Sequence, residues 1–180
     1  MSEEKNTTIK NKLTLKVATT AIFIAVGVVL SFLNPFGYFT IFGTKINPFI
    51  HLLNALSGVL LGLTFSVITA SGLAIIRFST NIGTINAFHG GISGAVIVSI
   101  ISHFLYKKYP KYVEYAAFSE PLGTVLIGGT ITALIEGFTI GTLLFFWGLF
   151  LVASAIGCTL GFIILKILKK SGYTRATFLD

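Results

Sequence analysis

The segment RFSTNIGTINAFHGGISG, residues 77–94, is polar and rich in glycine, yet long apolar segments precede and follow it. Irregular polar backbone at membrane depth is tolerated only where it is buried in protein or lines a water-filled cavity. The four glycines of this segment allow the backbone to approach another helix or a ligand closely. Two interpretations follow: the segment is the floor of a small-molecule pocket, or it is a polar loop whose glycines turn the chain and pack helices.

Composition places this segment in a membrane protein. Of the 180 residues, 54% are hydrophobic and 11% are charged, whereas a soluble domain carries roughly 25% charged residues. A chain of this length cannot hide so much apolar surface in one soluble core, so most of that surface must face lipid. The sequence therefore predicts an all-α integral membrane protein, a multi-pass protein of the cell membrane.

Apolar segments of about 20 residues are long enough to cross a bilayer as helices. The second and third candidates are short and poorly separated at Gly62, so that five spans would result if they were one helix. We expect helices over residues 13–33, 48–63, 65–77, 87–106, 118–135 and 140–168, with the first ended by Asn-Pro-Phe-Gly at residues 34–37.

The basic residues decide between five and six spans. Eleven of the thirteen lysines and arginines fall in three clusters near the ends of apolar segments, and such clusters face the cytoplasm and anionic lipid. Both termini are basic, so the number of crossings is even. Six transmembrane helices with both termini cytoplasmic satisfy every cluster and place Lys45 and residues 77–86 and 137–139 outside. The clusters are Lys5, Lys10, Lys12 and Lys16; Lys107, Lys108 and Lys111; and Lys166, Lys169, Lys170 and Arg175.

The chain reads as one membrane-embedded domain over residues 1–180. We expect cytoplasmic tails at residues 1–12 and 169–180 and a hydrophilic loop at residues 107–115.

Polar and ionisable side chains within membrane segments are costly and are functional candidates by default. On the six-span topology, His103 and Glu120 lie towards the inner side, away from the others. Arg77 and Glu136 lie at the same depth and can pair. Together with these two, the other candidates of the outer side converge in depth from several helices, which predicts a polar pocket that opens outward. The outer set is His51, Asn54, Arg77, Asn81, Asn86, His89 and Glu136.

The aromatic residues Trp147 and Phe145–Phe146 lie in the outer half of the last span, where they can stack on a flat heteroaromatic ligand.

Three histidines and several glutamates raise the alternative of an intramembrane hydrolase or a metal site. The sequence contains no H-E-x-x-H, G-x-S-x-G or C-x-x-C motif. It also has no phosphate-binding loop with its lysine, so we expect no ATP site in this chain. We therefore predict a binding protein with no catalytic residues, no metal and no cofactor of its own.

Small residues recur on the first span at Ala18, Ala21 and Ala25. Small residues four apart allow a second helix to approach closely in lipid. This face either packs against a helix of the same chain or docks a partner protein.

The middle of the chain carries a run of motifs that resembles the ThiW family. The first is Pro-Phe-Ile-His-Leu-Leu-Asn-Ala-Leu-Ser-Gly-Val-Leu-Leu-Gly at residues 48–62, and the resemblance covers residues 45–129 well. One departure is His89, which stands where the family pattern leads us to expect a proline. The later motif positions, in order, are Arg77, Gly83-Thr84, Ala87-Phe88, Gly90, Gly94-Ala95, Ser119-Glu120, Gly123-Thr124 and Gly128.

This resemblance implies the substrate-binding S component of a prokaryotic energy-coupling-factor (ECF) transporter, most closely one for the hydroxyethylthiazole precursor of thiamin. It also implies partners: a membrane scaffold subunit docked on the alanine face and two cytoplasmic ATPases, which alone use ATP. The alternatives within this class are hydroxymethylpyrimidine and thiamin as ligands. The alternative outside it is an enzyme that uses histidine and glutamate.

Overall fold

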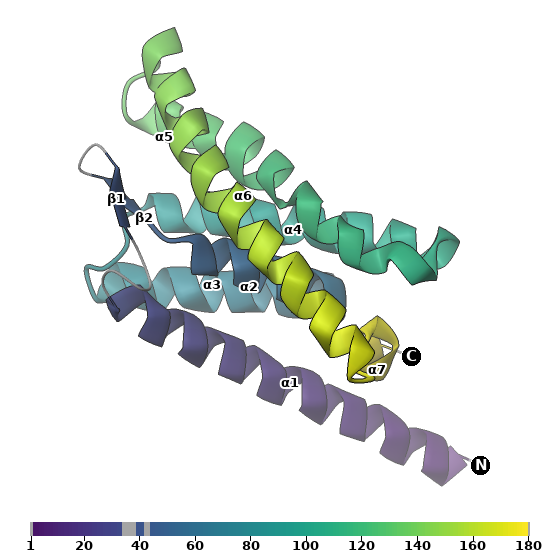
Figure 1. Ribbon diagram of the computed structural model, residues 1–180. Helices are drawn as coiled ribbons and strands as arrows, with labels where there is room; N and C mark the ends of the chain where they lie inside the picture. The colour runs from purple at the N-terminus through teal and green to yellow at the C-terminus, as the bar shows by residue number, and fades with distance from the viewer. Residues whose placement is uncertain (1, 34–38, 42–43, 180) are drawn as a thin grey trace.

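A computed structural model describes residues 2–33, 39–41 and 44–179, which form a helical bundle with one short β-hairpin (Figure 1). The predicted helical class is confirmed, apart from the two three-residue strands. In chain order the elements are α1 (Ser2–Phe32), β1 (Phe39–Ile41), β2 (Thr44–Ile46), α2 (Pro48–Leu60), α3 (Leu63–Ser79), α4 (Asn86–Lys108), the 3-10 helix η1 (Pro110–Ser119), the π-helix η2 (Leu122–Gly129), α5 (Thr130–Ile135), α6 (Ile140–Lys170) and α7 (Arg175–Leu179).

Helix α2 is the centre of the bundle. It contacts α6, α4, α3, η1 and α1, and every one of its residues except Phe49 is buried. Asn47 starts the helix, because its side-chain oxygen accepts a hydrogen bond from the Phe49 amide at 3.1 Å, and Pro48 supplies a preset first turn. A helix enclosed by protein on all sides needs no lipid-spanning length, which explains why α2 is short.

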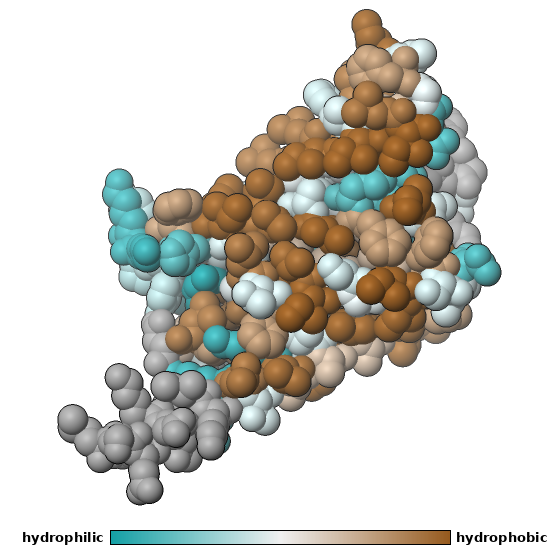
Figure 2. Space-filling model, turned by 180° about the vertical axis from the view of Figure 1, so that it is seen from behind, coloured by the Kyte–Doolittle hydropathy of each residue, from teal (hydrophilic) through white to brown (hydrophobic). Residues whose placement is uncertain are grey.

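Apolar side chains are found both in the core and on the outside of the bundle. Large apolar side chains cover the outside (Figure 2), as expected for surface that faces lipid. The interior includes many buried hydroxyls, such as Ser57, Ser66, Ser99 and Ser102, which donate to backbone carbonyls or to one another. These bonds satisfy polar groups that have no water available.

The expected loop at residues 107–115 is wrong. Helix η1 begins at Pro110 and leads through η2 and α5 to Ile135. In a 3-10 helix, residues three apart share a face. Val113, Ala116 and Ser119 are buried on one such face, while Tyr112 and Tyr115 are exposed on another. The polar appearance of this sequence therefore comes from the exposed face of a helix.

The C-terminal segment expected to be a tail is folded against the bundle. Helix α6 continues to Lys170, and α7 returns to place Arg175 in the interior, 4% exposed. Its guanidinium donates to the carbonyls of Gly58 and Val59, at 3.2 and 2.7 Å, and to the Ser102 hydroxyl at 2.8 Å. These contacts satisfy carbonyls at the C-terminal end of α2. At the other terminus, α1 already begins at Ser2.

Four described helical stretches are long and apolar enough to cross a bilayer: Asn11–Phe32, Asn86–Lys108, Pro110–Ile135 and Ile140–Lys170. The other two expected spans, α2 and α3, are apolar but shorter, and Leu61 and Gly62 separate them. The two chain termini lie at one end of the bundle and the β-hairpin lies at the other (Figure 1). Residues 34–37 and the side chains of Lys5, Lys10 and Lys45 lie outside the described part of the chain.

The six-span topology predicts that the α3–α4 connection faces the outside. Thr80 is exposed there. In a Cys158→Ala background, we expect Thr80→Cys to react with a membrane-impermeant thiol reagent in intact cells. Ser171→Cys, exposed at the end that carries the termini, should react only after lysis. The reverse pattern would invert the topology.

Candidate functional site

A cavity of about 520 Å³ opens between the α3–α4 connection, the starts of α2 and α4, and the N-terminal half of α6. The predicted pocket residues His51, Arg77, Asn81, Asn86 and Glu136 all line it, whereas Asn54, His89 and Trp147 do not. The full lining is Ile46, Asn47, Ile50, His51, Arg77, Asn81, Ile82, Gly83, Thr84, Asn86, Ala87, Gly90, Gly91, Thr124, Glu136, Phe145, Phe146, Phe150 and Ala153.

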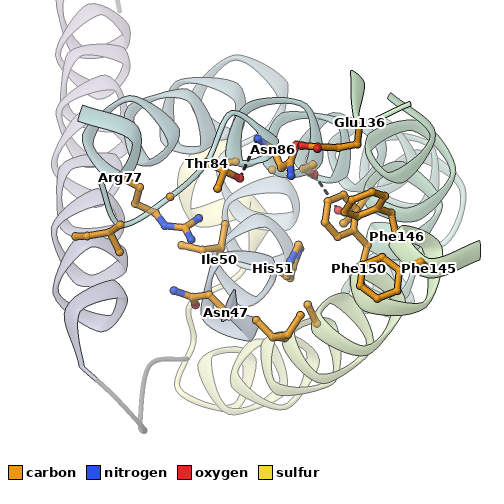
Figure 3. Close-up of a pocket in the computed structure, with 18 of the residues that line it drawn as sticks. Asn47, Ile50, His51, Arg77, Thr84, Asn86, Glu136, Phe145, Phe146 and Phe150 are labelled. Atoms are coloured by element: carbon orange, nitrogen blue, oxygen red, sulfur yellow. Dashed lines mark hydrogen bonds between the residues drawn. The ribbon is translucent and has the colours of Figure 1, made fainter. Parts of the chain in front are cut away.

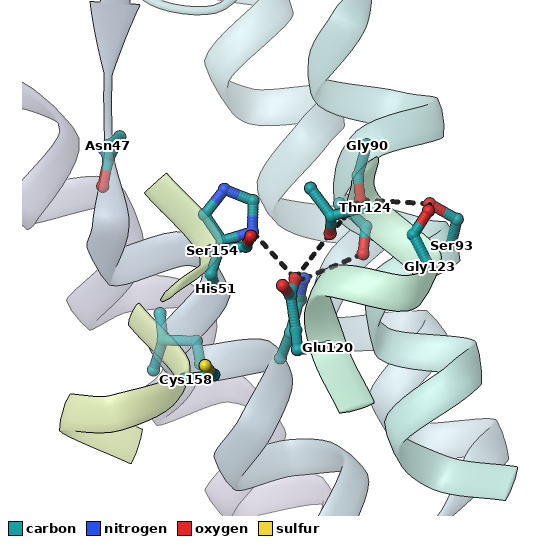
Figure 4. A network of polar contacts seen from close by, with 12 residues as sticks. Asn47, His51, Gly90, Ser93, Glu120, Gly123, Thr124, Ser154 and Cys158 are labelled. Carbon is teal, nitrogen blue, oxygen red and sulfur yellow. Dashed lines mark hydrogen bonds and ion pairs between the residues drawn. The ribbon is translucent and has the colours of Figure 1, made fainter. Parts of the chain in front are cut away.

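A buried hydrogen-bond network forms the floor of the cavity (Figure 4). Its acceptor is Glu120, which is 0% exposed. One oxygen, Oε1, accepts from Thr124 Oγ1 at 2.6 Å and from Asn54 Nδ2 at 3.0 Å, and it lies 2.8 Å from His51 Nδ1. With His51 Nδ1 held by the carboxylate, the ring presents Nε2 away from Glu120 (Figure 4), on the side of the cavity that His51 lines. Such a carboxylate fixes the tautomer and orientation of the imidazole.

The expectation that Glu120 and His51 lie at different membrane depths is therefore wrong. Helix η1 contributes ten residues before Glu120. At about 2 Å of rise per residue in a 3-10 helix, Glu120 lies roughly 20 Å beyond Pro110, well inside the bundle. His51 is only one turn into α2, which starts inside the bundle after the hairpin strand β2 (Figure 1). Because α2 starts deep in the bundle and η1 starts ten residues before Glu120, the His51 and Glu120 side chains reach the same level.

Asn54 lies one turn below His51 and is 1% exposed. Its amide nitrogen donates both to Glu120 and to the Gly91 carbonyl, at 3.0 and 2.9 Å. Two acceptors on one side of the amide fix its orientation, because only the nitrogen can donate. Asn54 therefore supports the floor from behind and joins α2 to α4.

The glycines of residues 77–94 fit both interpretations of that segment, because some line the cavity and another packs helices together. Gly90 and Gly91 line the cavity, whereas Gly94 makes room for the network: a Cβ there would overlap the Glu120 carboxylate and the Thr124 hydroxyl. A Cβ on Gly123 would likewise overlap backbone atoms of Ser93 and Gly94. These two glycines let α4 and η2 touch closely enough for Glu120 to reach α2.

The mouth of the cavity carries Arg77 and Glu136 on different walls (Figure 3). The predicted pairing between them is not seen, because the described residues form no ion pair between the two side chains. The Nε of Arg77 and the Oδ1 of Asn86 are buried and have no hydrogen-bond partner among the described residues.

Phenylalanines rather than tryptophan form the aromatic wall of the cavity. Phe145, Phe146 and Phe150 of α6 line it opposite Arg77 (Figure 3). Trp147 instead donates its indole N–H to Thr130 Oγ1 at 3.1 Å and does not line the cavity. Helical spacing alone does not separate the four residues, because residue 147 lies about 100° from residue 146 and about 60° from residue 150. The hydrogen bond to Thr130 holds the Trp147 side chain against α5 instead.

His89 also lies outside the lining. Its Nδ1 is 3.1 Å from the Gly128 carbonyl and 3.4 Å from Thr132 Oγ1, so the side chain joins α4 to η2 and α5. Its substitution for the expected proline therefore acts on how these helices pack.

Of the aromatic wall, Phe145 and Phe146 were among the predicted stacking residues, whereas Phe150 was not. Thr124 was also missed as part of the site, and Glu120 was placed towards the other side of the membrane. Glu120 could have been found from the sequence, because it is an ionisable residue in an apolar segment. The six-span topology instead placed it at a depth away from the pocket. The arrangement as a whole joins a polar floor, an aromatic wall and a charged mouth, which suits a small heteroaromatic molecule that carries a few hydrogen-bonding groups.

Comparison with protein families finds one described as thiamine-precursor transporter protein (ThiW), whose model matches residues 17–171. Neither the curated proteins nor the solved structures gave a match.

Proposed function

Because the chain belongs to the ThiW family of thiamine-precursor transporter proteins, we propose that it is the substrate-binding S component of an ECF importer. Its ligand in this proposal is the hydroxyethylthiazole precursor of thiamin, captured from outside the cell. The observation that carries the proposal is the cavity over the His51–Glu120 floor, since it joins an apolar wall to a few convergent polar groups.

The chemistry of the cavity fits a flat, weakly polar ligand. Phe146 and Phe150 offer ring edges and faces to a heteroaromatic ring. While the ring is neutral and Nδ1–H donates to Glu120, His51 Nε2 can accept a hydrogen bond from the ligand's hydroxyl. The Asn86 side-chain N–H can donate to the ring nitrogen. Its Oδ1, which has no hydrogen-bond partner among the described residues, can accept a hydrogen bond from the ligand.

Calorimetry on the purified protein tests the proposal. We expect hydroxyethylthiazole to bind the wild type, and we expect Asn86→Ala and Asn54→Ala to weaken binding. Loss of one buried hydrogen-bond partner typically costs about 1–3 kcal/mol, which corresponds to roughly 5- to 150-fold in affinity. Asn86 acts by lining the cavity and Asn54 by holding Glu120 in place.

Asn11→Ala is the matched control, because Asn11 is exposed near the start of α1 and its loss should leave the affinity unchanged. Wild-type affinity in both pocket variants would show that the ligand binds elsewhere. Competition by hydroxymethylpyrimidine and by thiamin in the same experiment separates the alternative ligands.

ThiW is a transporter family, so we expect binding without turnover. The His51–Glu120 contact also suits proton transfer, which is the one feature that favours the enzymatic alternative. Mass spectrometry of the ligand after prolonged incubation with the protein distinguishes the two: unchanged ligand supports the transporter, and a product that disappears in His51→Ala supports an enzyme.

A further inference from the structure

We propose that Arg77 and the N-terminal end of α4 form an anion subsite at the mouth of the cavity, so that the preferred ligand is the phosphate monoester of the thiazole alcohol. This inference rests on the proposed function and specifies the chemical class of the ligand. It differs from that proposal in one testable respect, because the free alcohol has no group for the subsite.

Arg77 is a cation with no partner inside the cavity. It lies in the last turn of α3, and its side chain extends into the space above Ile50 (Figure 3). Its Nε is buried without an acceptor among the described residues. The Arg77 residue as a whole is half-buried, and the fork of an arginine matches the oxygens of a phosphate with two parallel bonds.

The N-terminal end of α4 faces the same space. Asn86 and Ala87, its first two residues, line the cavity together with Gly90. The helix is 23 residues long and has no acidic side chain in its first turn. The helix dipole gives this end partial positive charge, while the amides of Asn86, Ala87 and Phe88 already donate to Thr84 and Ile85. Arg77 and this helix end therefore place positive charge at the mouth, which also carries the Glu136 carboxylate beside Asn86 (Figure 3).

Two simpler explanations of Arg77 do not account for its position. A basic residue at the C-terminal end of α3 interacts well with the helix dipole, but a side chain in solvent would serve that purpose without burying Nε. Pairing with Glu136 would also satisfy the Arg77 guanidinium, yet no ion pair joins these two side chains among the described residues. Glu136 is exposed, so its charge is screened by solvent.

The cavity also has room for the larger ligand. Its volume of about 520 Å³ exceeds what one five-membered ring with a two-carbon arm fills. With the ring against Phe146 and Phe150, the arm points across His51 towards Arg77 on the opposite wall (Figure 3). A phosphate on the terminal oxygen of that arm then lies on the side of the cavity that Arg77 lines.

Calorimetry with both ligands on the full-length protein in nanodiscs of zwitterionic lipid tests the inference. We expect the phosphate ester to bind the wild type at least about tenfold more tightly than the alcohol, as one charge-assisted contact provides. Arg77→Gln should weaken ester binding about 10- to 150-fold and alcohol binding less than about threefold. Arg77→Lys should retain part of the preference. Glu136→Gln, which removes a carboxylate from the same mouth, should leave ester binding equal or tighter.

The outcomes separate this inference from the proposed function. If the alcohol binds and the ester binds no better, the anion subsite is wrong while the thiazole site stands. If the ester is preferred equally by wild type and Arg77→Gln, the subsite lies elsewhere. If neither ligand binds a folded protein, the proposed function fails. Adding phosphatidylglycerol to the nanodiscs distinguishes a lipid headgroup site, because such a site would lower ester affinity as the anionic lipid competes.

Discussion

Under the proposed function, uptake of the thiazole precursor is expected to fall to background in Ala21→Trp and in Ala25→Trp. Both alanines and Ala18 are exposed on α1, whereas Thr20, Gly27 and Ser31 are buried on its other side. The alanine face is therefore not the face that α1 packs against its own chain. Small residues four apart allow a partner helix to approach closely in lipid, and an indole would hold that helix away.

The readouts are uptake of labelled ligand into cells and co-purification with the scaffold subunit. Ligand binding by the purified variant should be unchanged, because α1 does not line the cavity. Val26→Trp is the matched control: Val26 is also exposed, but it lies about 100° around the helix from Ala25. Tryptophan variants at Ala21 and Ala25 that still transport and co-purify would show that docking uses another surface.

Replacement of Glu120 by alanine should weaken ligand binding by more than about 100-fold, or roughly 2.7 kcal/mol. The change removes the acceptor shared by Thr124, Asn54 and His51. Each donor left unpaired in a buried site typically costs about 1–3 kcal/mol, and His51 loses the partner that fixes its tautomer. Glu120→Gln keeps one acceptor oxygen and the shape of the side chain, so its affinity should lie between those of alanine and wild type.

Thermal unfolding in detergent separates a lost site from a lost fold. Glu114→Ala is the matched control, because Glu114 is a buried glutamate of the same helical segment, 4% exposed. It pairs with Lys169 at 2.9 Å, away from the cavity. Glu114→Ala should lower the unfolding temperature and leave the affinity unchanged. Wild-type affinity in Glu120→Ala would show that the floor network is not part of the binding site.

Much of the fold could be predicted from local sequence, because lipid imposes a local rule. A helix must satisfy its own backbone within the bilayer, so apolar length alone located the helical segments, and their starts agree with the structure at Pro48 and Ile140. The loop expected at residues 107–115 is wrong because Pro110 begins a 3-10 helix, whose buried face repeats every three residues. Half-exposed aromatic and basic residues resemble a loop when only their average polarity is counted.

The candidate site was predicted in part, for a related reason. The sequence by itself determined that polar residues of several helices gather near one end, because their positions along each helix measure depth. Only the tertiary structure decided which of them meet: His51 reaches Glu120 across 69 residues of chain, Arg77 does not pair with Glu136, and Phe150 rather than Trp147 faces the cavity. These outcomes depend on the axial offset and rotation of whole helices. For the floor, close contacts at Gly94 and Gly123 set how α4 lies against η2, and no property of His51 or Glu120 alone contains that distance.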